Sequence, residues 1–130
     1  MKKLTPILFV EAVEPCLPFW TERLGFTVTA TVPRGDLIDF AMLQHGAVEL
    51  MYQSRVSVDA DLPSLTAEVM AGATTLFIEV DALDPIVDAL EGADVVAPRR
   101  QTFYGMDEIF VRAPCGTVVG FAARIETAEG

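Results

Sequence analysis

Four charged residues suited to acid–base chemistry lie in segments whose alternating apolar pattern predicts β-strands. They are Glu49, Glu79, Glu108 and Arg112. If the three carboxylates face one cavity, like charges held close together disfavour full ionisation, which raises the pKa of one of them. Such a carboxylate, with Glu49 as the candidate, can act as the general base of a metal-free isomerase or epimerase. The interpretation that we favour is an ion pair with Arg112 that only neutralises the cavity.

Aromatic side chains form a second group of candidates. A predicted loop from Arg99 to Met106 carries two arginines together with Phe103 and Tyr104. These two rings either contact a ligand or cover the edge of a sheet, and both interpretations stay open. Trp20, on a predicted helix face, is expected in the core. The chain has no Ser-His-Asp set, no Cys-His pair and no glycine-rich phosphate loop, so nucleophilic and nucleotide chemistry have no support.

The elements that must position these residues follow one order twice. In the first half, strands are predicted over 4–10, 26–32, 38–43 and 47–53. A helix that begins at Glu14-Pro15 and ends at Gly25 follows the first strand. In the second half, strands are predicted over 75–80, 95–97, 107–113 and 117–122, with a helix from Asp84-Pro85 to Gly92. Pro63-Ser64 is expected to begin a short helix in the connection between the halves.

The two halves match position by position at a separation of 70 residues. The pairs are Thr5 and Thr75, Leu8 and Ile78, Val10 and Val80, Glu14 and Asp84, Pro15 and Pro85, and Gly46 and Gly116. Six coincidences in register indicate an internal repeat. We therefore predict an α+β fold in which two βαβββ repeats form curved mixed sheets, with helices outside and a concave ligand cup. Residues 1–130 are expected to form one domain, with repeats 4–54 and 74–124 and a linker 55–73.

Strand alternation predicts which side chains face the cup. Aliphatic positions such as Leu8, Val10, Leu50, Ile78 and Val111 should pack against the helices. The predicted ligand-binding residues of the cup and its loop are Phe9, Phe40, Glu49, Met51, Phe77, Glu79, Phe103, Tyr104, Glu108, Phe110 and Arg112.

Composition and charge limit the partners. Among the 130 residues, 52% are apolar, and apolar surface in excess of a small core favours a homodimer. The net charge of −10 disfavours nucleic acid and anionic membranes and attracts cations. Cys16 and Cys115 lack zinc-site spacing and are expected to be free thiols. No segment reads as a secretory signal or a membrane span, which predicts a cytoplasmic protein.

Three segments resemble the vicinal-oxygen-chelate superfamily, which includes glyoxalase I, extradiol dioxygenases and the bleomycin-resistance proteins. The segments are P-F-W-T-E-R-L-G-F at 18–26, V-E-L at 48–50 and A-P-C-G-T-V-V-G-F at 113–121. They are similar to the family's helix end, its fourth strand and its second hairpin. With the repeat, the resemblance covers nearly the whole chain, and it implies the fold described above.

The resemblance also implies where the metal of the family's enzymes would bind. The corresponding positions are Thr5, Glu49, Thr75 and Gly120. Only Glu49 is a strong ligand, because a neutral threonine hydroxyl is a poor donor and glycine has no side chain. The one histidine, His45, falls in a predicted solvent-exposed turn. We therefore expect no metal and no other cofactor.

The sequence is most similar to the metal-free, bleomycin-resistance-like members of the superfamily. This similarity implies a non-enzymatic homodimer that binds a small bulky molecule, cationic or aromatic, for example to sequester an antibiotic. The alternative is a metal-dependent lyase, isomerase or dioxygenase of the same fold. A third interpretation is an accessory domain that binds another protein through its apolar surface. The cup can form within one chain or across a dimer.

Overall fold

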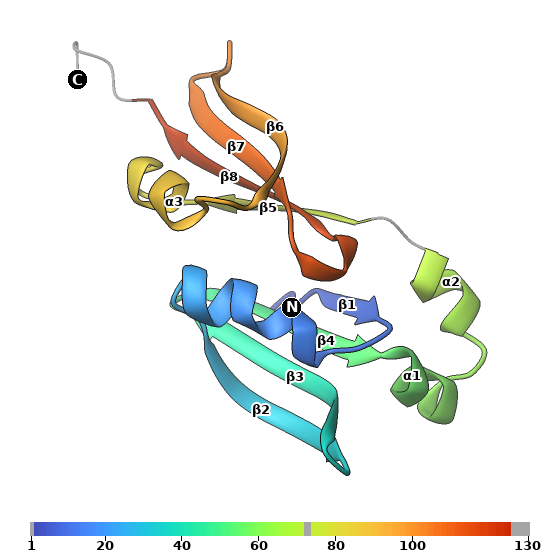
Figure 1. Ribbon diagram of the computed structural model, residues 1–130. Helices are drawn as coiled ribbons and strands as arrows, with labels where there is room; N and C mark the ends of the chain where they lie inside the picture. Colours follow the sequence, from blue (N-terminus) through green and yellow to red (C-terminus); the bar gives the residue numbers. More distant parts are fainter. Residues whose placement is uncertain (1, 72–73, 126–130) are drawn as a thin grey trace. The chain divides into compact units, whose positions relative to one another are not determined.

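The computed structural model of the protein describes residues 2–71 and 74–125. The chain divides into two compact units, Met1–Ala73 and Thr74–Gly130, and each contains one four-stranded sheet (Figure 1). The second unit begins at the residue where the second repeat is predicted to begin. The α+β class and the two βαβββ repeats are therefore confirmed. The single domain and the cup remain predictions.

In unit 1 the strand order is β1-β4-β3-β2. β1 pairs with β4 in parallel, and the other neighbours are antiparallel. Its elements are β1 (Ile7–Val10), a helical segment made of η1 (Glu14–Cys16) and η2 (Phe19–Arg23), β2 (Thr27–Arg34), β3 (Leu37–His45), β4 (Val48–Ser54), α1 (Arg55–Asp61) and α2 (Thr66–Ala71).

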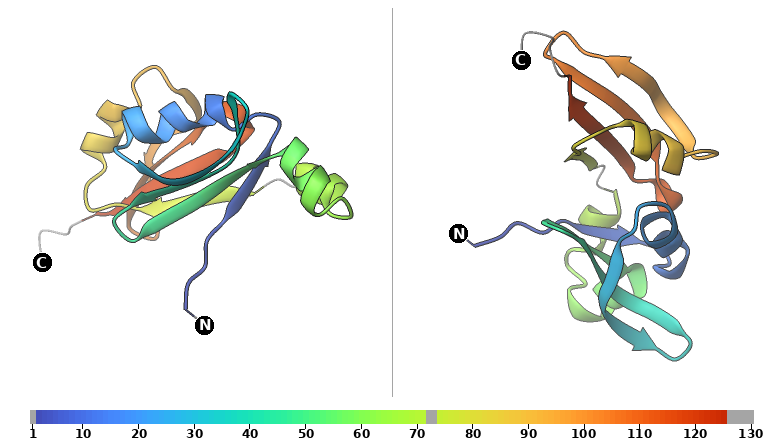
Figure 2. Two further views of the ribbon diagram at one scale, coloured as in Figure 1. Left: turned by 90° about the horizontal axis from the view of Figure 1, so that it is seen from below. Right: turned by 90° about the vertical axis from the view of Figure 1, so that its left-hand side faces the viewer.

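Unit 2 repeats this topology with the strand order β5-β8-β7-β6 and a parallel β5–β8 pair (Figure 2). Its elements are β5 (Thr75–Glu79), α3 (Asp84–Ala89), β6 (Asp94–Gln101), β7 (Met106–Arg112), η3 (Pro114–Gly116) and β8 (Val118–Arg124). β1 and β5 correspond at the separation of 70 that the sequence predicts, but β4 and β8 do not: Ile7 pairs with Met51 and Phe77 with Gly120, so Gly120 takes the position of Met51.

The core of unit 1 is built around Trp20. Pro15 lies in the first turn of the helical segment, where its missing N–H costs no hydrogen bond. Gly25 follows the segment with φ +72°, a conformation that glycine adopts without strain. Trp20 is fully buried, as predicted, and its Nε1 donates a 2.8 Å hydrogen bond to the hydroxyl of Tyr52 on β4. This bond fixes the helical segment against one face of the sheet.

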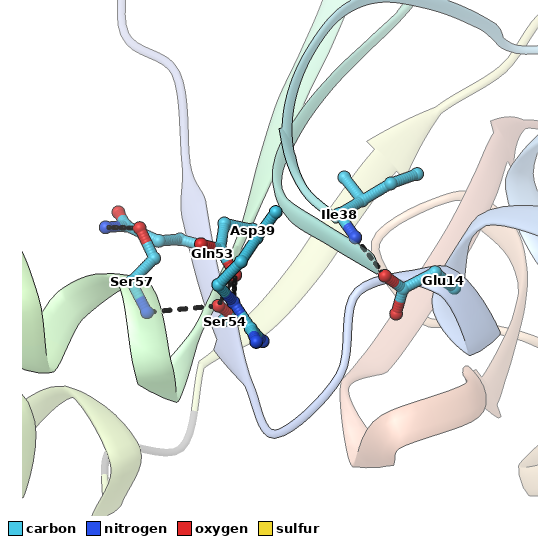
Figure 3. A network of polar contacts seen from close by, with 7 residues as sticks. Glu14, Ile38, Asp39, Gln53, Ser54 and Ser57 are labelled. Carbon is cyan, nitrogen blue, oxygen red and sulfur yellow. Dashed lines mark hydrogen bonds and ion pairs between the residues drawn. The ribbon is translucent and has the colours of Figure 1, made fainter. Parts of the chain in front are cut away.

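Polar contacts also join the elements of unit 1 (Figure 3). The Glu14 carboxylate accepts from the backbone N–H of Ile38, which ties the helical segment to the β2–β3 hairpin. The Ser54 hydroxyl donates to Asp39 at 3.0 Å and accepts from the N–H of Ser57 at 3.1 Å. Ser54 is thus the N-cap of α1, and it also joins α1 to β3.

The side chains of each sheet alternate between two faces, as the sequence predicts. In unit 1 the Tyr52 face carries the buried Leu8, Ala41, Leu43, Leu50 and Tyr52, and the Met51 face carries the half-buried Phe9, Phe40, Met42, Met51 and Gln53. In unit 2 the Val111 face carries the buried Ile109, Val111, Val119 and Phe121, and the Phe110 face carries Phe77, Glu79, Glu108, Phe110 and Arg112.

Some predicted boundaries are wrong. β6 continues through Arg99 and Arg100, so the predicted arginine-aromatic loop shortens to 102–105. β2 likewise continues through Pro33 and Arg34, and its turn is only Gly35-Asp36. Both are edge strands with register shifts near their prolines, at Pro33 and Pro98, where a missing N–H is tolerated. The linker contains two helices rather than one.

Two further observations concern the cysteines and membranes. Cys16 is buried and disulfide-bonded, so the free-thiol prediction is wrong for this residue. The side chain of Cys115 lies outside the described part of the structure. Within residues 2–71 and 74–125, no helix has the length and apolar character needed to cross a bilayer.

Candidate functional site

Glu49 occupies a polar corner on the Met51 face of unit 1. Its carboxylate lies 2.8 Å from the Nζ of Lys3 and accepts a 3.0 Å hydrogen bond from the hydroxyl of Thr5. The side chain of Glu49 is only 9% exposed, whereas that of Lys3 is 62% exposed. The hydrogen bond from Lys3, followed by that from Thr5, holds the pKa of Glu49 below its usual range. A lowered pKa is the opposite of what a general base near neutral pH requires.

Gly120 in unit 2, which the superfamily resemblance assigns as a metal-ligand position, lies among aromatic rings. Gly120 pairs across the sheet with Phe110 on one side and Phe77 on the other. A Cβ at Gly120 would lie 2.4 Å from Cε2 of Phe110, so this ring occupies the space of the missing side chain. The rings of Phe77 and Phe110 have centroids 6.3 Å apart. Thr75 lies beside Val118 rather than beside Gly120.

These residues do not fit the divalent metal of the superfamily's enzymes. A site of that kind needs several carboxylate or imidazole donors at fixed geometry. Glu49 already has an ammonium as partner, Gly120 has no donor, and a phenyl ring lies over it. His45 is exposed at the end of β3, with its ring 5.4 Å from that of Phe26. Among residues 2–71 and 74–125, no group of three His, Cys, Asp or Glu side chains is arranged for a metal.

Glu108 is a buried carboxylate on the Phe110 face. It is 1% exposed, and its Oε1 accepts from Nη2 of Arg100 at 2.8 Å and from Nε at 3.1 Å. The hydroxyl of Tyr104 lies 3.1 Å from both carboxylate oxygens. Glu108 raises the pKa of Arg100 above its usual range, chiefly through these hydrogen bonds. The three side chains form a satisfied cluster, which fixes the loop at 102–105 to β7.

The loop aromatics therefore have different roles. Tyr104 is half-exposed and anchored through its hydroxyl, whereas Phe103 is fully exposed and packs edge-on against Tyr104 at 5.1 Å. Phe103 covers no part of the sheet edge. For this ring the covering interpretation is wrong, and the ligand-contact interpretation remains.

Among the described residues of unit 2, neither Glu79 nor Glu108 forms the ion pair with Arg112 that was expected for a carboxylate of the cluster. Arg112 lies 3.7 Å from Asp94, and Glu108 has Arg100 as its partner instead. Glu79 lies 3.8 Å from Arg124. In unit 2 each predicted acid thus has a basic neighbour, but on a different strand from the one expected, because alternation predicts a residue's face and not its cross-strand neighbour.

The remaining predicted ligand-binding residues lie in two adjacent rows of the Met51 face. Ile7, Met51 and Met42 are paired in one row, and Phe9, Gln53 and Phe40 in the next. All are half-buried except Ile7, which is 43% exposed. The rows give unit 1 a mainly apolar surface beside the Glu49 corner.

A charged pocket of about 400 Å³ lies elsewhere in unit 2, beside the start of α3. Arg99 forms ion pairs there with Asp84 at 2.7 Å and with Asp107 at 2.8 Å. The hydrogen bond from Arg99 holds the pKa of Asp107 below its usual range, and Asp107 in turn raises that of Arg99. Since these charges satisfy one another, we regard the pocket as structural.

Sequence reasoning missed Lys3 and Arg100 as partners of the site carboxylates. Lys3 precedes β1 by four residues, so no alternation pattern includes it. Arg100 was assigned to a loop. Had β6 been extended through Pro98, its pairing with β7 would have placed Arg100 opposite Glu108.

Two four-stranded units of identical topology, each with a helix after its first strand, define the class of paired βαβββ proteins. A family model described as the Glyoxalase/Bleomycin resistance protein/Dioxygenase superfamily matches residues 4–121. The chain belongs to this superfamily, as its sequence motifs predict. A comparison with curated proteins finds no match.

Solved structures share the fold at low sequence identity. TioX from Micromonospora sp. ML1 aligns with a TM-score of 0.78 and 16% identity, over 96% of this chain and 100% of that chain. A glyoxalase/bleomycin resistance protein/dioxygenase from Nocardioides aligns with a TM-score of 0.74 and 18% identity, over 98% and 87%. Lactoylglutathione lyase from Agrobacterium tumefaciens aligns with a TM-score of 0.74 and 14% identity, over 95% and 94%. At these identities the likeness concerns the fold alone.

Proposed function

We propose that this protein binds a small bulky organic molecule without a metal ion and, by sequestering it, protects against an antibiotic. The proposal rests chiefly on one observation: aromatic surface occupies the position that the superfamily resemblance assigns to a metal ligand. Gly120 leaves room for the Phe110 ring, which lies beside Phe77. Phe77 is 54% exposed, so this pair offers flat apolar surface to a planar molecule.

The charge of the protein favours a cationic ligand over an anionic one. The net charge is −10, and an acidic surface attracts cations and repels phosphates and nucleic acids. Bleomycin, which combines planar rings with positive charge, is therefore a suitable first probe. One similar structure has the composite name glyoxalase/bleomycin resistance protein/dioxygenase and another is a lactoylglutathione lyase, so the names are compatible with both a binder and an enzyme.

Calorimetric titration with bleomycin and a panel of planar cationic drugs tests the proposal. We expect saturable binding to the wild type and weaker binding to Phe110→Leu and Phe77→Leu. Leu62→Ala is the matched control, because Leu62 is 48% exposed but lies outside both sheets. Absence of heat with the whole panel would contradict the proposal.

Elemental analysis of the purified protein separates this function from metal-dependent catalysis. The proposal requires metal to be sub-stoichiometric. A stoichiometric transition metal that is lost in Glu49→Ala would refute the metal-free interpretation. A protein that co-purifies stably and blocks drug binding would favour an accessory domain instead.

We further propose that the protein is a homodimer. Large apolar side chains are exposed in both units, among them Leu4, Val32, Phe77 and Phe103. Surface of this kind is commonly covered by a partner. Sedimentation equilibrium at micromolar concentration should give twice the 14.1 kDa mass of the chain, and a mass of one chain would contradict the dimer.

A further inference from the structure

We infer that Glu49 binds the ammonium group of an amine ligand on the Met51 face of unit 1 and that Lys3 is a built-in competitor for it. This inference rests on the proposed function and specifies the ligand as an amine attached to an apolar body. It depends on three observations within unit 1: the contact between Lys3 and Glu49, the difference in their exposure, and the apolar rows beside them.

The chain itself shows which group the corner accepts. An ammonium, that of Lys3, lies 2.8 Å from the carboxylate, and the hydroxyl of Thr5 donates a second hydrogen bond at 3.0 Å. The carboxylate is only 9% exposed, and these two donors compensate for the water that it has lost. A primary amine of a ligand presents the same three N–H donors as lysine and can replace Lys3 without changing the charge of the corner.

Lys3 is fixed in position less firmly than Glu49. Lys3 is 62% exposed and lies in the segment before β1, and an exposed ion pair on a flexible stem contributes little. Among the described residues of this segment, the first backbone hydrogen bond to the sheet comes later in the chain, from the N–H of Met51 to the carbonyl of Pro6. Thr5 adjoins Pro6, whereas Lys3 lies three residues before it, so Lys3 is the donor that we expect to leave Glu49 first.

The surface beside the corner suits the apolar part of such a ligand. The row of Ile7, Met51 and Met42 lies next to Glu49 on the same face, since Glu49 and Met51 are two residues apart on β4. Methionine side chains adapt to ligands of different shape. A ligand whose amine binds to Glu49 would thus place its apolar rings over this row.

Fluorescence titration with dansylcadaverine, a naphthalene carrying a primary amine, tests the inference, with uncharged dansylamide as the matched probe. We expect the amine to bind more tightly than the amide, and Lys3→Met to tighten amine binding about two- to five-fold, the range of an exposed ion pair. Lys2→Met is the matched control, because it removes the same charge from a residue that is not a partner of Glu49. It should leave the affinity nearly unchanged.

Glu49→Gln provides the decisive comparison. In the Lys3→Met background it should weaken amine binding about ten-fold or more, the value of a charge-assisted hydrogen bond, and leave dansylamide unaffected. Equal affinities of the two probes, with no effect of Glu49→Gln, would overturn the amine inference while leaving a metal-free apolar binder. If Lys3→Met and Lys2→Met behave alike, the competitor role of Lys3 is wrong. Failure of both probes to bind to any variant would count against the proposed function itself.

Discussion

The structure makes a specific prediction for the effect of Gly120→Ala on the free energy of unfolding. A Cβ at this position would lie 2.4 Å from Cε2, 2.8 Å from Cδ2 and 2.8 Å from Cζ of Phe110. Carbon atoms in contact are about 3.5–4.0 Å apart, so Gly120→Ala forces the ring to withdraw by roughly 1 Å or more. Overpacking of this kind costs about 1–3 kcal/mol. Because Phe110 is only half-buried and can turn outward, we expect the lower half of that range.

The same substitution should have the opposite sign once the ring is removed. Gly120 is not among the positive-φ glycines, so its backbone suits alanine. In the Phe110→Ala background, Gly120→Ala should stabilise the protein by about 0.5–1 kcal/mol, the usual gain from replacing glycine within a strand. The coupling between the two positions is therefore predicted at about 1.5–3 kcal/mol.

Urea denaturation of the wild type, both single variants and the double variant measures this coupling. Gly92→Ala serves as the control, because Gly92 has φ +80° and no side chain near its missing Cβ. It should cost about 1–2 kcal/mol in both backgrounds, since backbone strain does not depend on Phe110. A Gly120→Ala variant that is neutral in the wild type, or equally affected in both backgrounds, would refute the assignment of the Phe110 ring to this space.

Three further predictions concern the core and the cap of unit 1. Trp20→Phe should cost about 1–3 kcal/mol in urea denaturation, because it leaves the buried hydroxyl of Tyr52 without its donor, and in a Tyr52→Phe background the cost should be smaller. Burial raises the pKa of Tyr52 to about 12, so the tyrosine of the unfolded chain ionises first as the pH rises above 10. The free energy of unfolding should therefore fall by about 2–3 kcal/mol between pH 10 and 12. A Tyr52→Phe variant with the same pH dependence would contradict this. Ser54→Ala should cost about 1–2 kcal/mol through loss of the α1 cap and of the bond to Asp39, whereas the exposed Ser64→Ala should have no effect by thermal denaturation.

The repeat made most of the fold predictable. Acid-proline pairs at Glu14-Pro15 and Asp84-Pro85 begin the helical segments in both units, as predicted. Alternation identified Leu50 and Val111 as buried and placed Met51 and Phe110 on the other faces. Boundaries were less predictable, because an edge strand tolerates proline and the sequence does not show which strands lie at edges.

The candidate site was predictable only in part. The sequence identified Glu49, Gly120 and the aromatic residues, and it indicated that the donors for a metal are lacking. That the predicted ligand-binding residues contact a ligand stays a prediction. The drug titrations and the comparison of dansylcadaverine with dansylamide test it. Arg112 was expected to neutralise the cluster, but the partner of Glu108 is Arg100, since the partner of a buried carboxylate depends on the register between β6 and β7.

The sequence by itself determined the duplicated βαβββ order, the faces of β1, β4, β5 and β7 and the superfamily, because periodicity and turn residues are local properties of the chain. Only the tertiary structure decided which groups meet. It placed the ammonium of Lys3 at Glu49 and the ring of Phe110 over Gly120. Contacts of this kind join residues 10 to 46 positions apart, and their geometry follows from strand register and side-chain packing, which no local pattern encodes.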